Sequence, residues 1–548
     1  MASSDVADLV ITGAPVLTMD GVRRWADAVA VRGGRISAVG AADDVRNLVS
    51  KSTRVIELDG GMVLPGFQDA HLHPLHAGLA EAQCDLHYVV GADGYTNAIS
   101  TYAREHPERE WVLGSGWSMD AFPGGTPHRL ELDRLVSDRP AFLVNRDGHG
   151  AWVNTRALEM ASITRSTSDP RDGRIERDEN GEPSGSLHEG AMDLVRRLVP
   201  PPTIDDLVDA LRRAQRRLLA FGITAWQDAW IVGAELEAYR RLADSGELTA
   251  RIVLSLLWER QRDEEQLPEL LERRERGTIG RMRAATAKIF QDGVVENFTA
   301  AMTEPYLDAS GRPTDNSGIS MIEPEALKRY VTLLDREGFQ VHIHAIGDRA
   351  VRESLDAIEA ARTANGVRDA RHHICHLQVV HPEDVPRFRG LNVVPNCQPF
   401  WACNEPQMRE LTIPFLGPER AAHQYPFASL RRAGATLAFG SDWPVSTPDP
   451  LLEIEVAVTR VPPDERSEPP FLPDERLDLP AALEGFTMGS AYVNRLDEST
   501  GSIESGKLAD ICVLDRDLFA LDGANISDAR VVLTLVEGEA VYDPQGIL

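Results

Sequence analysis

Two histidines, His71 and His73, stand near the end of the segment LPGFQDAHLHP, which begins as an apolar run. Side chains two residues apart on a strand face the same side, so both imidazoles can bind one metal ion. An isolated H-x-H pattern is more often a pair of surface histidines. Three residues that end other apolar segments strengthen the metal interpretation: His344, His376 and Asp442.

The residues around these positions leave alternatives open. His342 shares a strand face with His344, so it can support a ligand from behind or contact substrate. Asp442 follows the apolar segment LAFGS, where a carboxylate without a partner would face the cost of partial burial. We therefore expect Asp442 to have a charged or metal partner.

A lysine adds a second type of candidate ligand. Lys288 begins the short apolar segment KIFQDG, although a lone lysine is usually a solvated surface charge. An inward-facing amine has a lowered pKa and can react with carbon dioxide. The resulting carbamate would be a bridging metal ligand.

Strands alternate with amphipathic helices between about residues 210 and 490, which favours a (β/α)8 barrel with a parallel sheet. In one repeat, Thr203 is the expected N-cap of a capping box with Asp206, an amphipathic run follows over 207–220, and Gly222 marks the stop before a strand. The active sites of such barrels lie at the carboxyl ends of the strands. The candidate ligands occupy such positions.

Short strands separated by turn residues occur at both ends of the chain and predict a small, antiparallel β unit. The whole chain is thus predicted as an α/β protein with a (β/α)8 TIM-type barrel over 64–494. A β-sandwich domain combines 1–63 with 495–548. A cap over 85–200 is inserted after the first barrel strand, because that stretch is too long for a simple connection.

The composition restricts partners and location. With 57 basic and 85 acidic residues, the net charge of -28 disfavours nucleic acid and membrane surfaces. The five cysteines have no short paired spacing, which favours free thiols and a cytoplasmic location. We expect a small-molecule substrate and a homodimer.

The segments LPGFQDAHLHP, KIFQDG, HAIGD, CHLQVV and FGSDWPV resemble, in this order, motifs of the YtcJ-like branch of the amidohydrolase superfamily. The resemblance covers nearly the whole chain. It implies that His71, His73 and Asp442 bind one ion and that His344 and His376 bind a second. Lys288, in carboxylated form, would bridge the two ions.

One segment departs from the family pattern. The family commonly has Glu-His-Ala-Gln where this chain has Cys375-His376-Leu377-Gln378. The histidine is retained, so the departure affects the surroundings of the ligand. The cofactor expected is one or two divalent ions, with zinc favoured and manganese, iron or cobalt also compatible with these donors.

The resemblance implies a metal-dependent hydrolase of a non-peptide carbon–nitrogen bond, with an N-acyl or N-formyl compound as substrate. Water activated by the metal would attack the carbonyl, and Asp442 would act as the proton shuttle. The alternatives are hydrolysis of a cyclic amide, carbamate, urea or ester, and a barrel that serves as a non-catalytic scaffold. The predicted substrate contacts are Trp117, His149, Trp152 and His342, with Phe122, Phe400 and Trp401 as further pocket residues.

Overall fold

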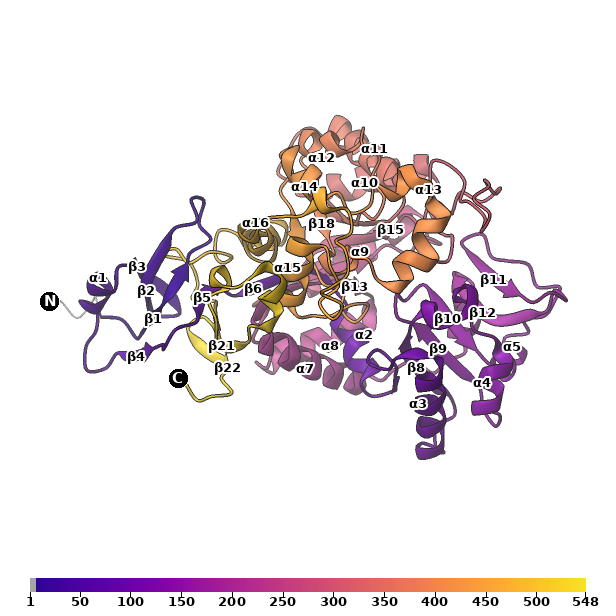
Figure 1. The fold of residues 1–548 in the computed structure, drawn as a ribbon, viewed down its shortest axis with the longest axis horizontal. Helices are drawn as coiled ribbons and strands as arrows, with labels where there is room; N and C mark the ends of the chain where they lie inside the picture. Colours follow the sequence, from indigo (N-terminus) through magenta and orange to yellow (C-terminus); the bar gives the residue numbers. More distant parts are fainter. Residues whose placement is uncertain (1–5) are drawn as a thin grey trace.

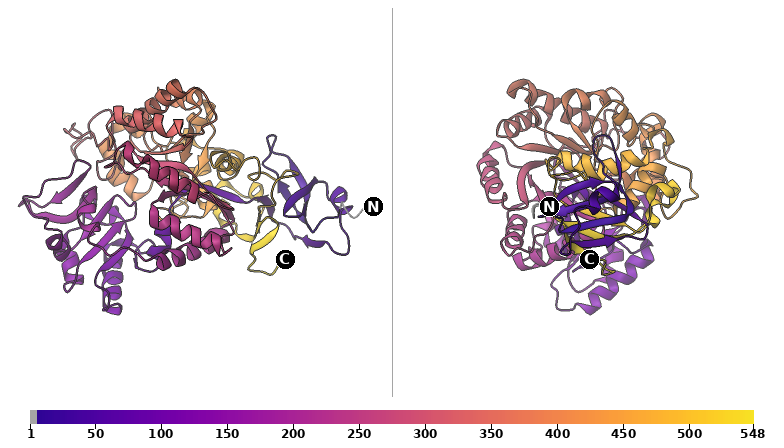
Figure 2. Two further views of the ribbon diagram at one scale, coloured as in Figure 1. Left: turned by 180° about the vertical axis from the view of Figure 1, so that it is seen from behind. Right: turned by 90° about the vertical axis from the view of Figure 1, so that its left-hand side faces the viewer.

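The computed structural model describes residues 6–548, and its strands form three hydrogen-bonded sheets (Figure 1). A barrel stands in the middle, with the sheet built from both chain ends on one side and the inserted domain on the other (Figure 2). Within the described part of the chain, no helix has the length and apolar character needed to cross a membrane.

The central sheet has eight strands, and every adjacent pair in it is parallel. In chain order the strands are β6 (Phe67–Leu72), β13 (Ile223–Ile231), β14 (Arg251–Leu257), β15 (Met282–Phe290), β16 (Gln340–Ala345), β17 (His373–His376), β18 (Val394–Cys397) and β19 (Ala438–Phe439). Just beyond β19, the Asp442 amide donates to the His71 carbonyl at 2.7 Å, and the His73 amide donates to the Trp443 carbonyl at 2.7 Å. The sheet is a nearly closed barrel, as predicted.

Helices follow the barrel strands and cover the sheet. They are α2 (Pro74–Ala80), α7 (Ile204–Ala220), α8 (Gly233–Asp244), α9 (Leu267–Arg276), α10 (Pro324–Arg336), α11 (Asp348–Asn365), α12 (Val385–Leu391), α14 (Phe427–Arg432) and α15 (Pro450–Thr459). The predicted capping box is confirmed, since the Thr203 side chain accepts from the Asp206 amide and the Asp206 side chain accepts from the Thr203 amide. The helix begins at Ile204, directly after the predicted N-cap Thr203, and it ends at Ala220.

The chain ends combine in an eight-stranded sheet. Its strands are β1 (Leu9–Leu17), β2 (Trp25–Arg32), β3 (Arg35–Gly40), β4 (Arg54–Glu57), β5 (Met62–Pro65), β20 (Ile511–Leu514), β21 (Val531–Val536) and β22 (Glu539–Tyr542). The purely antiparallel arrangement was wrong, because β1 pairs in parallel with β4 and β5. The crossover through α1 (Ala42–Arg46) returns the chain in the same direction. The sandwich arrangement stays a prediction.

The inserted segment forms its own six-stranded sheet, in which β7 to β9 are parallel and the remaining pairs are antiparallel. Its elements are β7 (Cys84–Asp85), α3 (Gly91–Glu105), β8 (Val112–Trp117), α4 (Arg129–Leu135), β9 (Ala141–Asn145), β10 (Gly150–Val153), α5 (Thr155–Met160), β11 (Gly173–Arg177), β12 (Pro183–Glu189) and α6 (Asp193–Arg196). It follows β6 and α2, where the sequence predicts an insertion.

A buried arginine connects the barrel to the terminal sheet. Arg251 begins β14, and its guanidinium lies 3.3 Å from Asp510 Oδ2 and 2.8 Å from Glu537 Oε1. Both carboxylates flank strands of the terminal sheet. Loss of the cation would leave Asp510 as a buried carboxyl without its ionic partner.

We expect Arg251→Met to lower the free energy of unfolding by about 3 kcal/mol, because it removes one partner of a buried ion pair. Urea unfolding followed by far-ultraviolet circular dichroism measures the change. Arg212→Met is the control, since the Arg212–Glu247 pair is on the surface, and it should change the urea midpoint little. Equal effects of the two substitutions would contradict the role of Arg251.

Candidate metal centre

Four predicted ligands converge at the carboxyl ends of the barrel strands. His71 Nε2 and His73 Nε2 lie 3.4 and 3.2 Å from Asp442 Oδ1. His376 Nδ1 lies 3.8 Å from Asp442 Oδ2. Residues from the first, sixth and last barrel strands therefore surround one carboxylate.

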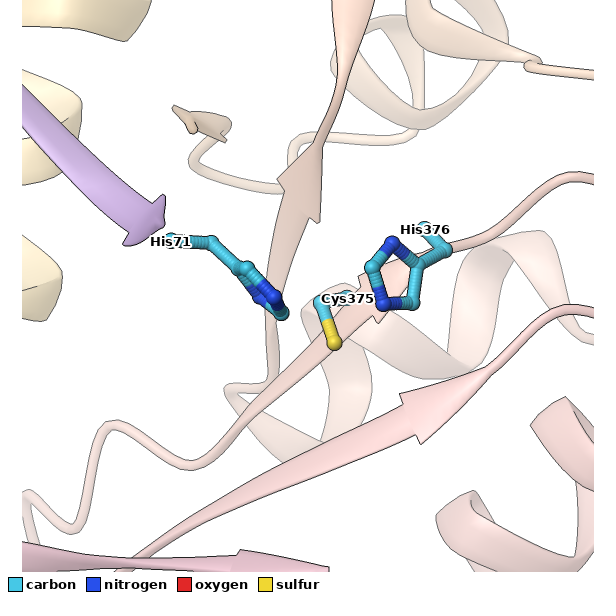
Figure 3. Close-up of side chains that lie close together, drawn as sticks. All are labelled: His71, Cys375 and His376. Carbon is cyan, nitrogen blue, oxygen red and sulfur yellow. The ribbon is translucent and has the colours of Figure 1, made fainter. Parts of the chain in front are cut away.

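The donor atoms of this cluster have the properties of metal ligands. His71 Nε2, His376 Nδ1 and Asp442 Oδ1 are buried and have no hydrogen-bond partner among residues 6–548. Figure 3 shows the rings of His71 and His376 approaching each other from two strands, with Cys375 between them. Buried polar atoms normally have partners. A divalent cation fits here, because one donor atom from each of His71, His73 and Asp442 lies within 4.8 Å of the other two.

Burial also sets the protonation of the imidazoles. It lowers the pKa of His71 and His376 well below the ordinary histidine value, and nearby Lys288 and other histidines add to the effect. Both rings are neutral at physiological pH, the form that binds metal ions.

The backbone takes uncommon conformations at two of the ligands. His376 has φ 76° and Asp442 has φ 55°, both in the left-handed region that costs energy for residues other than glycine. Gly440, two residues before Asp442, leaves room for β6, since a Cβ there would lie 2.5 Å from the His71 amide nitrogen. The FGSD sequence thus permits the close approach of the first and last strands.

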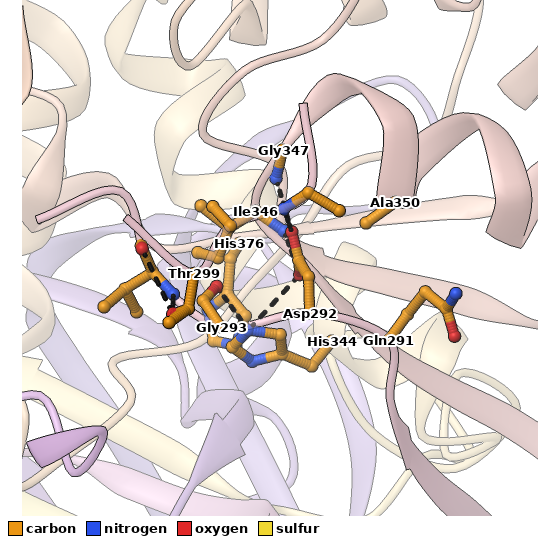
Figure 4. A network of polar contacts seen from close by, with 12 residues as sticks. Gln291, Asp292, Gly293, Thr299, His344, Ile346, Gly347, Ala350 and His376 are labelled. Atoms are coloured by element: carbon orange, nitrogen blue, oxygen red, sulfur yellow. Dashed lines mark hydrogen bonds and ion pairs between the residues drawn. The ribbon is translucent and has the colours of Figure 1, made fainter. Parts of the chain in front are cut away.

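His344 lies at the edge of this cluster. Its ring centroid is 4.4 Å from that of His376, and its Nε2 donates to the Gly293 carbonyl at 3.2 Å (Figure 4). Asp292 Oδ1 is 3.6 Å from the same nitrogen and accepts from the Ile346 amide. Burial raises the pKa of Asp292 to about 8. With Nε2 protonated, the lone pair of His344 is on Nδ1.

Lys288 points into the barrel, as predicted. The side chain is fully buried, and its Nζ lies 3.4 Å from Cys375 Sγ and 4.8 Å from the centroid of the Phe290 ring. Burial lowers the pKa of its amine. A lowered pKa increases the fraction of unprotonated amine, which is the form that reacts with carbon dioxide. The carboxylation of Lys288 stays a prediction.

His342 supports a ligand from behind. Its Nε2 is 2.9 Å from His71 Nδ1, and its Nδ1 is 3.2 Å from Ser255 Oγ. The ring is fully buried and lies 4.0 Å from the ring of His373, centroid to centroid. The alternative role of a supporting residue fits this geometry, and contact of His342 with substrate stays a prediction. The proton on His71 Nδ1 leaves Nε2 free to bind an ion.

The inserted domain contributes His149 to this region. Its ring centroid is 5.1 Å from that of His344, and its Nδ1 is 3.0 Å from both carboxylate oxygens of Glu189. Burial alone would lower the pKa of His149, but the charge and hydrogen bond of Glu189 raise it to about 9. Contact of His149 with substrate stays a prediction.

The two tryptophans predicted to contact substrate belong instead to the core of the inserted domain. Trp117 is 1% exposed and Trp152 is 2% exposed. Their indole nitrogens donate to the Leu143 and His128 carbonyls, at 2.9 and 3.2 Å. Both rings pack on Phe122, which is equally a core residue. This correction follows from packing, since apolar side chains suit a core and a pocket alike.

Other aromatic rings lie beside the candidate ligands. Trp401, from the predicted group, stacks on His376 with 5.2 Å between centroids. Trp230 and Phe290 lie 5.3 Å apart, and Phe290 is 5.1 Å from His344. These three rings are partly exposed and provide apolar surface beside the cluster.

Sequence reasoning missed three polar residues. Asp292 lies within the segment KIFQDG, two residues after β15, so its position near a strand end was a usable signal. Cys375 was noted as a departure from the family pattern without a role. Glu189, at the end of β12, offered no spacing signal because it approaches the site from another domain.

The comparisons agree with this geometry. The chain matches the amidohydrolase family over residues 54–542. It is 33% identical to YtcJ of Bacillus subtilis, with 94% of this chain and 96% of that protein covered. It is 27% identical to the N-substituted formamide deformylase of Arthrobacter pascens, with 99% and 100% covered. The crystal structure of an uncharacterized metal-dependent hydrolase from Pyrococcus horikoshii has a TM-score of 0.72 at 25% identity, with 94% of this chain and 99% of that chain covered.

A nearly closed parallel barrel with imidazoles and a carboxylate at its strand ends defines a class of metal-dependent hydrolases. The chain belongs to the amidohydrolase family. Membership supports hydrolysis of carbon–nitrogen bonds with a divalent metal cofactor. The family that the sequence motifs predict is confirmed.

We expect His342→Phe to weaken zinc binding by about 10- to 100-fold, because His71 would lose the acceptor that orients its ring. Competition with a chromogenic chelator measures the affinity. His381→Phe is the control, since the His381 side chain is 37% exposed, and it should bind zinc as the unchanged protein does. Unaltered zinc affinity in the His342 variant would contradict the supporting role.

Proposed function

We propose that the protein hydrolyses the amide bond of an N-acyl or N-formyl amine at a metal centre held by His71, His73, His344, His376 and Asp442. The observation that carries the proposal is the convergence of buried nitrogen and oxygen donors that lack hydrogen-bond partners in the described part of the chain. Imidazole and carboxylate donors suit Zn²⁺ well. A non-catalytic scaffold fits less well, because such a barrel would be expected to have lost these ligands.

A divalent ion bound there would polarise a carbonyl oxygen and lower the pKa of a water molecule from about 15.7 to about 7. The protein's own part is to hold neutral imidazoles and one carboxylate in place. Asp442 faces both sides of the cluster, with Oδ1 near His71 and His73 and Oδ2 near His376. It is therefore well placed to move a proton.

In this proposal, Asp442 accepts the proton lost by water as the water oxygen adds to the carbonyl carbon. It then returns that proton to the amide nitrogen as the carbon–nitrogen bond breaks. The products are a carboxylic acid and an amine. One side chain thus serves as ligand and proton carrier.

The substrate class is supported by a relative and by the aromatic surface. The Arthrobacter pascens enzyme is named for N-substituted formamides, which supports a small N-formyl compound. Trp230, Phe290 and Trp401 would contact the apolar substituent of the amine. His149, oriented by Glu189, would donate a hydrogen bond to the carbonyl oxygen.

The remaining predictions concern the whole molecule. The acidic surface and the free cysteines support a cytoplasmic protein that acts on a small molecule. We propose a homodimer as its state in solution, on the general preference of large enzymes for closed symmetric assemblies.

A panel of N-formyl amines, N-acyl amines, lactams, carbamates, ureas and esters tests the reaction class. We expect amine release from N-formyl and N-acyl amines, loss of activity after dialysis against a chelator, and recovery on addition of Zn²⁺. Release is measured with an amine-reactive fluorophore. Activity confined to lactams, carbamates, ureas or esters would redirect the substrate class, and full activity in the metal-free protein would contradict the proposal.

We expect Asp442→Asn to lower kcat by about 100- to 10,000-fold, because the amide cannot carry the proton. The thermal midpoint should change little, since asparagine preserves the shape of the side chain. Asp474→Asn, in an exposed 3-10 helix, is the control and should keep full activity. A kcat within threefold of the unchanged enzyme would rule out Asp442 as the proton carrier.

A further inference from the structure

Cys375 lies beside two of the metal-binding histidines. One donor atom from each of His71, Cys375 and His376 lies within 4.8 Å of the other two, and all three residues are buried (Figure 3). In a regular strand, adjacent residues such as Cys375 and His376 face opposite sides. The positive φ of His376 breaks this alternation and lets both side chains face His71.

The surroundings of the sulfur are polar. Cys375 Sγ accepts from Lys288 Nζ at 3.4 Å and its S–H donates to the Ile343 carbonyl oxygen at 3.3 Å, and burial raises the pKa of this thiol to about 12, so it is protonated before an ion binds. Cys397, on the neighbouring strand β18, is equally buried but belongs to no group of candidate metal ligands among residues 6–548. The position of Cys375 is therefore that of a ligand, whereas Cys397 is a core residue.

We propose that Cys375 is a thiolate ligand of the ion that His71 and His376 hold, and that Lys288 remains an uncarboxylated amine that donates a hydrogen bond to the sulfur. The inference rests on the metal centre of the proposed function. On binding, the S–H bond breaks, the proton passes to solvent and a sulfur–metal bond forms, without oxidation or reduction.

The thiolate and a carboxylated Lys288 are alternatives for the same place. A carbamate on Nζ would add a second negative charge beside Sγ, which starts only 3.4 Å from that nitrogen. In a buried pocket these two anions repel each other unless a bound cation compensates both. The uncarboxylated amine instead stabilises the thiolate. A sulfur ligand also favours softer ions such as Zn²⁺ and Cd²⁺ over Mn²⁺.

Cobalt substitution of the full-length protein tests the ligand. Visible absorption shows that Co²⁺ is bound, and a near-ultraviolet charge-transfer band shows that a thiolate coordinates it. We expect both bands in the unchanged protein, loss of only the near-ultraviolet band in Cys375→Ser, and both bands in the Cys397→Ser control.

Visible absorption without the near-ultraviolet band in the unchanged protein would overturn the thiolate ligand and leave the metal centre intact. Absence of both would overturn the metal centre too. If the Cys375→Ser variant does not fold, cadmium-113 NMR of the unchanged protein gives the same information, because a sulfur ligand shifts the cadmium resonance downfield. Carbon-13 NMR after incubation with labelled bicarbonate supplies the last check, since a lysine carbamate signal lost in Lys288→Arg would overturn the proposal.

Discussion

The closure of the barrel between its first and last strands is the constraint on which the site depends. Two backbone hydrogen bonds, from the Asp442 amide to His71 and from the His73 amide to Trp443, hold the ends of β6 and β19 together. Gly440 permits this approach because any Cβ would meet the backbone of His71. The same bonds bring the carboxylate between the two histidines, so closing the sheet and assembling the ligand set are one event.

The candidate ligands are buried, so further polar groups are needed behind them to hold their rings in place. A buried imidazole is neutral, so a hydrogen bond must fix which ring nitrogen carries the proton. His342 accepts from His71 Nδ1, and the Gly293 carbonyl accepts from His344 Nε2. The buried Lys288 amine contacts the Cys375 thiol and the face of the Phe290 ring, which offset part of the cost of removing it from water. The candidate metal centre is thus a set of buried polar groups, and several of their nitrogen and oxygen atoms have no hydrogen-bond partner in the described part of the chain.

The barrel and the placement of the candidate ligands were predictable, because strand alternation and the apolar runs before His71, His344, His376 and Asp442 indicate where strands end. Roles that depend on packing were not. Trp117 and Trp152 have the composition of pocket residues but lie in the core of the inserted domain. Cys375 and His376 both face the site because His376 has a positive φ, which no side-chain pattern encodes.

The terminal sheet joins strands from opposite ends of the chain, since β5 pairs with both β1 and β20. During synthesis, the edge of β5 therefore stays unpaired until β20 has been made, and an unpaired strand edge is prone to aggregation. Asp442 leaves the ribosome roughly 20 to 75 s after His71 at ordinary elongation rates. In the proposed metal centre Asp442 therefore joins the histidines late in synthesis, and a chain that ends before Asp442 lacks the carboxylate of that centre.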